Sequence, residues 1–282
     1  MIDAIQHDQA SHSITLEANR VDGAMETIRI SRVDLEAPWR WLSAGLSDLV
    51  AMPQVGLVYG AVFAMIAIGL WLGLSSMGWQ SAMLALGGGF MLIGPILAVG
   101  LYEVSRQRAL GLKPEFGDVV FAGFRSLDQL ALLGLGLALL YMIWVELAFL
   151  LFMIFFGDRP FPPIDEFIPR LLFTWHGVTM LIVGTIAGAC LAVIVFSISV
   201  ISAPMLISRP VGVSSAVIAS LNATLLNFKP MALWAVLIAA FMAVGIVTLC
   251  IGLIVLFPLI GHASWHAYRE IIDVVDEVAE PS

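Results

Sequence analysis

Two histidines of this sequence have a type and spacing that could support chemistry inside an apolar segment. His262 and His266 are four residues apart, so in a helix both imidazoles lie on one face. Neutral imidazoles placed in this way are able to share a copper or zinc ion, and each alone is able to be an axial haem ligand. The alternative is an interfacial pair that hydrogen-bonds helix ends or lipid head groups. We expect this interfacial pair and no bound cofactor, and we keep the metal or haem site as the second possibility.

A single carboxylate, Glu146, interrupts a long apolar run beside Trp144. It lies ten residues before Phe156, about 15 Å along a helix and therefore deep in a membrane. A carboxylate at that depth costs several kcal/mol unless it is protonated or paired, so we expect Glu146 to face the interior of a helix bundle. The functional interpretations are a proton relay, an ion site and a contact with a partner subunit. A protonated glutamate that donates one interhelical hydrogen bond is the structural alternative.

Three prolines, Pro95, Pro204 and Pro258, lie within apolar runs and predict helix kinks. Each proline lacks the N–H that would bond the carbonyl four residues earlier. Broken helices line binding sites in transporters, but kinks that serve packing alone are the interpretation we favour. The sequence contains no glycine-rich phosphate loop after a strand, no nucleophile elbow and no zinc-protease motif. We therefore expect that the protein is not an enzyme.

The composition places these residues in a membrane protein. The chain is 60% hydrophobic and 12% charged, whereas soluble domains are roughly half apolar and a quarter charged. Several runs exceed the ~20 apolar residues that cross a bilayer core. Both cysteines lie in such runs, so no disulfide framework is expected. The net charge of −8 arises in the two tails and predicts no nucleic-acid partner.

The expected fold is an all-α polytopic bundle of six transmembrane helices. The repeat consists of a cytoplasmic amphipathic surface helix followed by a hairpin of two spans, and it occurs three times. The expected spans are 53–74, 81–103, 129–156, 171–208 and two within 231–268, with a tight turn at 245–252. The surface helices are expected at 38–52, 114–128 and 213–228, which gives repeat units over 38–103, 114–208 and 213–269 of the membrane domain 38–269.

The two tails are expected to be polar and cytoplasmic. Residues 1–37 predict a partly disordered tail, disordered over 1–15, with a short strand-like segment at 26–30. Residues 270–282 predict an acidic tail with one apolar helical face. Of the thirteen Lys and Arg residues only Arg159 and Arg170 fall on the opposite side of the expected spans, which places both termini in the cytoplasm. The residues expected to anchor the membrane interface are Trp39, Trp41, Trp265, Tyr268 and Arg269.

Two motifs carry a resemblance to a known family. They are Pro38-Trp39-Arg40-Trp41-Leu42-Ser43-Ala44-Gly45-Leu46-Ser47-Asp48-Leu49, leading to Pro53 and Tyr59-Gly60, and Gly261-His262-Ala263-Ser264-Trp265-His266-Ala267-Tyr268-Arg269. With them, residues 38 to about 275 resemble a bacterial family of predicted integral membrane proteins of unknown function. Some members are labelled as cytochrome c oxidase subunits. The resemblance implies the bacterial inner membrane and a link to respiratory oxidases, without an assigned activity. The histidine set of a haem-copper catalytic subunit is absent from the sequence, so an oxidase role would be accessory.

The leading functional hypothesis is a non-catalytic accessory subunit or assembly partner of a membrane complex, such as a respiratory cytochrome c oxidase. Its expected partners are the lipid bilayer and other membrane subunits, with the acidic tail as a docking helix. One alternative is a small transporter or lipid-handling protein that uses Glu146 and the proline-kinked spans. The other is a haem or copper carrier through His262 and His266.

Overall fold

The computed structural model describes residues 13–274 apart from 21, 23, 24, 80, 115–116, 118–126 and 158–161. The described part is mostly helical, and four of its helical segments are long and apolar enough to cross a membrane. They are α3 (Pro53–Ser76), α7 (Leu127–Phe156), α9 (Trp175–Ser199) continued by α10 (Ser202–Ser208), and α12 (Phe228–Val247). The prediction of a helical membrane protein is thereby confirmed.

The expectation of six spans in three hairpins is not confirmed. Two expected spans, α4 (Ala82–Leu97) and α13 (Leu253–Ile271), are not among these four segments. The 16 residues of α4 are short for a bilayer core. The second half of α13 carries two histidines, His262 and His266, and two charged side chains, Arg269 and Glu270. A tight turn between α12 and α13 is present at the expected place, since α12 ends at Val247 and α13 begins at Leu253.

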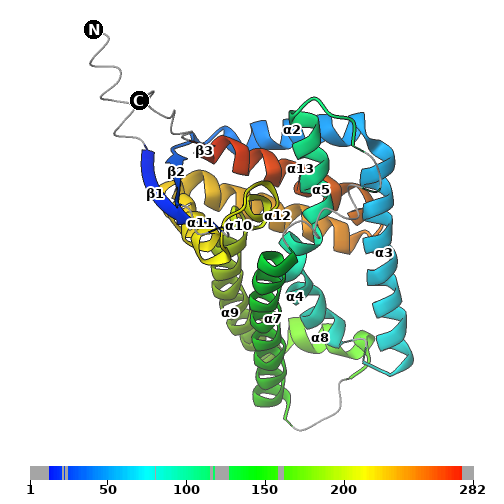
Figure 1. Ribbon diagram of the computed structural model, residues 1–282. Helices are drawn as coiled ribbons and strands as arrows, with labels where there is room; N and C mark the ends of the chain where they lie inside the picture. The colour runs from blue at the N-terminus through cyan, green and yellow to red at the C-terminus, as the bar shows by residue number, and fades with distance from the viewer. Residues whose placement is uncertain are drawn as a thin grey trace, which may run out of the picture.

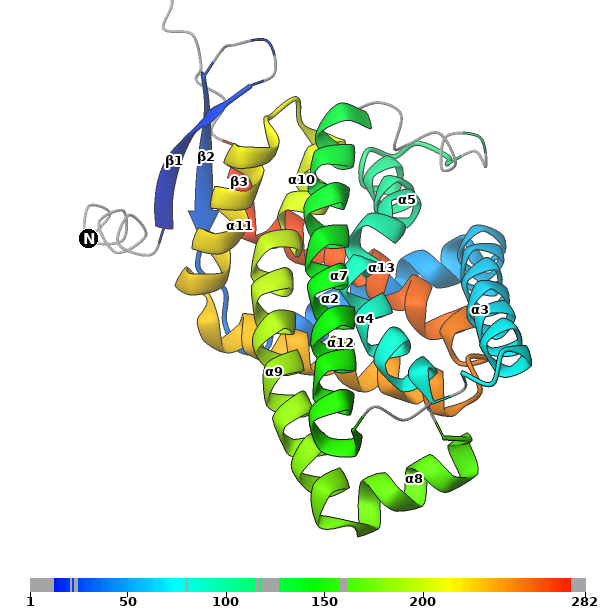
Figure 2. The ribbon, with the colours of Figure 1, turned by 90° about the horizontal axis from the view of Figure 1, so that it is seen from below.

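The described helices form two groups that cross each other. In Figures 1 and 2, α7 and α9 lie side by side, and the α12–α13 hairpin runs across them in both views. The second group is centred on α13, which packs against α2 (Ala37–Ala51), α3, α5 (Val99–Ala109) and α12. Two further helices complete the part that the structure describes: α8 (Ile164–Phe173) packs on α9, and α11 (Val213–Leu226) packs on α9 and α10. The α12–α13 hairpin is therefore not aligned with α7 and α9, and the expected bundle of three hairpin units is not confirmed.

A small glycine allows α2 to cross α13 at close range. A Cβ on Gly45 would lie 2.6 Å from the backbone nitrogen of Ala263, closer than real Cβ contacts. Small residues at helix crossings bring backbones together in this way. The crossing fixes the face of α2 that is buried, and this face carries the polar side chain described below.

A three-stranded sheet corrects the all-α prediction. The strands β1 (Ser13–Asn19), β2 (Met25–Ser31) and β3 (Ile272–Val274) pair antiparallel in the order β1-β2-β3. Ile28 and Ile30 are fully buried on one face of β2, as alternation in a strand requires. The strand expected at 26–30 is confirmed. Disorder at 13–15 and a helical tail at 272–274 were wrong, because these segments pair with β2. Residues 1–12 and 275–282 lie outside the described part.

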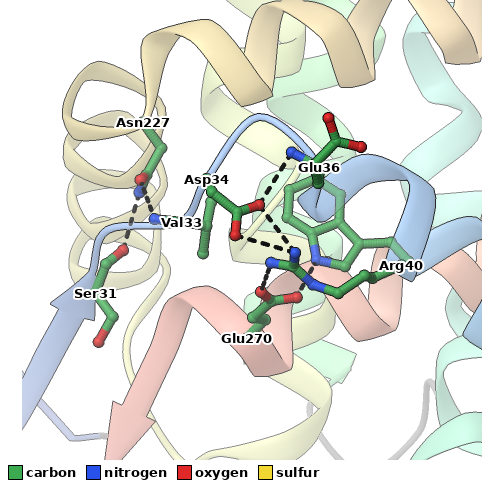
Figure 3. Close-up of polar contacts among 8 residues, drawn as sticks. Ser31, Val33, Asp34, Glu36, Arg40, Asn227 and Glu270 are labelled. Carbon is green, nitrogen blue, oxygen red and sulfur yellow. Dashed lines mark hydrogen bonds and ion pairs between the residues drawn. The ribbon is translucent and has the colours of Figure 1, made fainter.

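A network of polar side chains fastens the connection from β2 to α2 onto the helices (Figure 3). Asn227 accepts a hydrogen bond from the backbone N–H of Val33 at 2.8 Å and donates one to the carbonyl of Ser31 at 3.0 Å. Arg40 pairs with Asp34 at 2.9 Å and with Glu270 of α13 at 2.5 Å. The N-terminal and C-terminal tails are therefore joined both by strand pairing and by side chains.

The expected surface helices have mixed outcomes. Helices α2 and α11 occupy the first and third expected positions, and most of the second, 114–128, lies outside the described residues. On α2, Trp41 is 1% exposed and Leu49 is 5% exposed, whereas Leu46 is 49% exposed. The buried positions Trp41, Gly45 and Asp48 follow a four- and three-residue spacing, which is a helical face.

Candidate functional site

A buried polar cluster joins α2, α5 and α13. The hydroxyl of Ser105 lies 2.6 Å from Oδ2 of Asp48 and 2.8 Å from Nδ1 of His262. Nε2 of His266 lies 2.8 Å from the same Asp48 oxygen. Asp48, Ser105 and His262 are almost completely buried, whereas His266 is partly exposed. The two histidines thus share one helix face, as their spacing predicted, and that face is directed at Asp48 and Ser105.

The hydrogen bonds assign the protons of this cluster. A serine hydroxyl has one hydrogen. Because Ser105 donates it to the carboxylate of Asp48, Ser105 has to accept from His262, so Nδ1 of His262 carries a hydrogen. In a neutral imidazole Nε2 is then a bare acceptor. That nitrogen is buried, has no hydrogen-bond partner among the residues that the structure describes, and lies toward Gly56 of α3.

The charges around Asp48 keep it ionised. Burial alone would raise the pKa of Asp48, but hydrogen bonds from His266 and Ser105 outweigh burial and hold that pKa below its ordinary value. Arg108 of α5 adds a positive charge 3.4 Å from Oδ1. His262 is held in its neutral form instead. It lies on α13, outside the four candidate spans. Burial lowers the pKa of the His262 imidazole to about 4 despite the nearby Asp48 carboxylate.

The order of the three groups indicates a structural role. In a serine-nucleophile triad the imidazole stands between the acid and the serine and takes the serine proton. Here Ser105 stands between Asp48 and His262, and its proton points to the carboxylate. Among the described residues, no group of three or more His, Cys, Asp and Glu side chains could hold a metal ion. The arrangement is suited to holding three helices together.

Sequence reasoning missed Asp48, Ser105 and Arg108. Asp48 could have been found from its spacing to Trp41 and Gly45, which places it on the buried face of α2. Ser105 and Arg108 are three residues apart on α5. The other members of the cluster, Asp48, His262 and His266, are 57 to 161 positions away from Ser105 in the chain, and nothing in the sequence connects them with it. The expected interfacial placement of the pair was wrong for His262, which is fully buried.

Glu146 lies on the exposed face of α7, so the expectation that it faces the interior was wrong. The physical reason is its neighbour Trp144, whose ring nitrogen donates to the carbonyl of Ala85 in α4 at 2.7 Å. A helix turns by about 200° in two residues, so a Trp144 that faces α4 directs Glu146 away from it. Among the described residues, Glu146 has no hydrogen-bond or ion-pair partner.

The three prolines have different settings. Pro204 lies in α10, just after the break between α9 and α10 at residues 200–201. The hydroxyl of Ser220 in α11 spans this break, accepting from the N–H of Ile201 and donating to the carbonyl of Ser197. Pro95 lies near the end of α4, which is followed by α5 after one residue. Pro258 lies inside α13, which is continuous through it.

Three of the five expected interface anchors are core residues instead. Trp41, Trp265 and Tyr268 are at most 1% exposed, whereas Trp39 and Arg269 are exposed. The Trp41 ring nitrogen donates to Glu270 at 2.7 Å, and the Tyr268 hydroxyl accepts from Arg209 at 2.9 Å. The polar groups of Trp41 and Tyr268 therefore meet protein groups where head groups were expected, whereas the Trp265 ring nitrogen is buried with no hydrogen-bond partner among the described residues.

Residues 82–208 match the model of a family described as "Predicted integral membrane protein (DUF2189)". The matched part runs from α4 to α10 and includes Glu146, Pro95 and Pro204. It does not include the motifs at 38–60 and 261–269 on which the resemblance seen in the sequence depends. No curated protein and no solved structure matches the chain. Together with its apolar helices, the match indicates an integral membrane protein similar to a family without an assigned function.

Proposed function

We propose that the protein is a non-catalytic subunit or assembly partner of a membrane complex, and that α7 contacts the partner. The observation that carries this proposal is the position of Glu146, exposed on a helix that is long and apolar enough to cross a membrane.

Glu146 interrupts an exposed apolar stripe along α7. Its apolar members are each more than half exposed and follow one another at three- and four-residue spacing. This spacing is that of a helix-packing seam, in which a single polar position sets register and partner choice. The α7 stripe consists of Leu132, Leu135, Leu139, Met142, Glu146, Leu150 and Met153.

A carboxyl group facing hydrocarbon is unfavourable by several kcal/mol unless another group meets it. Since the described part of this chain provides no partner for Glu146, a second helix in the membrane is the natural source. A basic side chain, Lys, Arg or His, would neutralise the carboxylate and form a charge-assisted hydrogen bond. The partner that fits is therefore a transmembrane helix that carries a basic residue at the depth of Glu146.

The pairing of the two tails supports a topology in which both tails lie on the same side of the membrane. β2 pairs with β3, so residues 28–30 and 272–274 lie together. A chain whose two tails pair directly crosses the bilayer an even number of times. The distribution of Lys and Arg favours the cytoplasmic side of a bacterial inner membrane. A respiratory cytochrome c oxidase is the complex that the family resemblance suggests.

Site-specific photo-crosslinking tests the proposal in native membranes. A photoreactive amino acid at Met142 or Leu150, which flank Glu146, should give an adduct with one discrete membrane protein. The crosslinked peptide should come from an apolar segment containing Lys, Arg or His. In a Glu146→Leu background the adduct should be lost, whereas Glu146→Gln, which keeps a hydrogen bond without charge, should weaken it.

The control position is Ile186 on α9, which is also exposed on a helix apolar enough to cross a membrane. Adducts of equal yield at Ile186, or adducts with lipid alone at Met142 and Leu150, would rule out a specific partner at α7. An adduct between two copies of this chain would replace the proposal with a homo-oligomer. Oxidase peptides among the adducts would support the respiratory complex, and their absence from a discrete adduct would contradict it.

A further inference from the structure

A cavity of about 350 Å³ lies on the side of α13 opposite the polar cluster. It is bounded by α4, α9, α12 and α13, and α5 contributes to one end. Small side chains and a proline create the space, among them Pro95, Ala98, Ala192, Ala239 and Gly261. Its size falls within the range of small-molecule sites. The α7 stripe contributes none of the residues that line it, so the cavity is independent of the function proposed above.

The cavity opens onto the apolar surface of the protein. Val193 of α9 and Val236 of α12 both line it and are 63% and 64% exposed. Both helices belong to the segments apolar enough to cross a membrane. A molecule entering between them would therefore come from the hydrocarbon of the bilayer, and an apolar chain is the shape and chemistry that this entrance admits.

Three hydroxyl groups line the cavity among the described residues; that of Ser199 donates to the carbonyl of Val195, which leaves those of Tyr102 and Ser264 on the buried side. Tyr102 of α5 and Ser264 of α13 are 3% and 6% exposed. The two helices meet there, because Leu101 packs against Gly261. Neither hydroxyl has a hydrogen-bond partner within the described residues, although each has a donor and an acceptor to satisfy. Leaving such groups unpaired is unfavourable, so the cavity favours a ligand that provides hydrogen-bonding atoms at this end.

The lining also defines the charge of the ligand. No Asp, Glu, Lys, Arg or His side chain is present among the described residues that line the cavity. A phosphate or carboxylate head group would find no cation there and would lose its hydration without compensation. A hydroxyl or carbonyl oxygen, in contrast, is neutral and has two lone pairs, so it is able to accept hydrogen bonds from both Tyr102 and Ser264.

We propose that this cavity binds a hydrocarbon chain with a neutral hydrogen-bonding head group, a hydroxyl or carbonyl, which contacts Tyr102 and Ser264. The chain enters between α9 and α12 and occupies the apolar part of the cavity. The head group lies against α5 and α13, close to the helices that carry the polar cluster. The protein thereby binds one neutral lipid-like molecule within the plane of the membrane.

Photoaffinity labelling in lipid nanodiscs tests this inference with three matched probes. The probes share one diazirine-bearing C16 chain and end in a methyl group, a primary alcohol or a carboxylate. The alcohol should label peptides of α9, α12 and α13 in preference to the other two. Tyr102→Phe and Ser264→Ala should each reduce the preference for the alcohol over the methyl probe by roughly fivefold, the effect of one neutral hydrogen bond. Labelling by the methyl probe should stay unchanged in both variants.

Ala192→Phe fills the cavity from an exposed position on α9 and should reduce labelling by all three probes. Glu146→Leu should leave labelling unchanged. The partner contact at α7 and the ligand site in the cavity are therefore tested separately, and either one is able to fail without the other. Absence of labelling at the cavity peptides would overturn the binding site. Equal labelling by alcohol and methyl probes, or a preference for the carboxylate, would overturn the neutral head group.

Discussion

Gly60 of α3 lies against the backbone carbonyl of Ile254 in α13, and a Cβ at Gly60 would overlap that oxygen. Ile254 is four residues before Pro258, so its carbonyl has no intrahelical N–H to bond. The absence of a side chain at Gly60 thus allows α3 to cover the one carbonyl of α13 that the proline frees.

We expect Gly60→Ala to destabilise the protein by about 1–3 kcal/mol, because the added methyl group has to push two backbones apart. Thermal unfolding in detergent would show this as a lower Tm. The matched control is Gly69→Ala in the same helix, where a Cβ would meet nothing within 4 Å. The control should be neutral or slightly stabilising, because alanine favours helix more than glycine does. Equal effects of the two substitutions would contradict a tight crossing at Gly60.

Ser105→Ala tests the polar cluster. Removing the hydroxyl takes one hydrogen bond from the Asp48 carboxylate and the acceptor from His262, both buried. The expected loss is about 1–3 kcal/mol of unfolding free energy, since the partners remain in place without compensation. Ser214→Ala is the control, because Ser214 is an exposed residue of α11. A stability change no larger than that of the control would show that the cluster does not join the three helices.

Asn227→Ala tests the attachment of the N-terminal strand. The side chain of Asn227 is nearly buried and serves two backbone groups, the N–H of Val33 and the carbonyl of Ser31 (Figure 3). Losing both bonds should raise hydrogen exchange of the β2 amides by one to two orders of magnitude, which corresponds to about 1–3 kcal/mol. Asn222→Ala, which removes an exposed hydrogen bond to the Ile218 carbonyl within α11, should leave β2 exchange unchanged.

The local elements could be predicted from the sequence, because hydropathy and alternation report on short segments. The apolar runs became helices, the turn expected within 245–252 lies at 248–252 between α12 and α13, and Ile28 and Ile30 alternate as in a strand. The relative directions of the helices could not be predicted. Hydropathy identifies an apolar segment without fixing its crossing angle, and that angle depends on contacts such as Gly45 with Ala263 and Gly60 with Ile254.

The candidate site was predictable only in its local part. The spacing of His262 and His266 correctly placed them on one helix face, but their partners on α2 and α5 are far away in the chain. The orientation of Glu146 was wrong for a related reason. Depth in the membrane sets the energy of a carboxylate, whereas the packing of Trp144 against α4 decides the direction in which the carboxylate points.

The folded protein should lose stability as the pH falls from about 6.5 toward about 4, because of His262. Burial lowers its pKa from 6.5 to about 4, so in this window the unfolded chain binds a proton that the folded chain does not. Stability therefore rises with pH across the window, by at most about 1.4 kcal/mol per pH unit, and is fully present above pH 6.5. Below this window Asp48 adds to the loss, because its pKa is also lowered and its protonation removes the acceptor for Ser105 and His266.

Unfolding midpoints measured at half-unit steps between pH 7.5 and pH 4 would check this slope. His262→Gln removes the titrating group but keeps an N–H that is able to donate to Ser105. We expect this variant to be less stable at pH 7 and to show a flatter dependence on pH between 6.5 and 4. His176→Gln, at an exposed position at the start of α9, should keep the slope of the unmodified protein. A slope that survives His262→Gln would mean that other groups cause the acid sensitivity, and that the imidazole of His262 is not held neutral by burial between α2, α3 and α5.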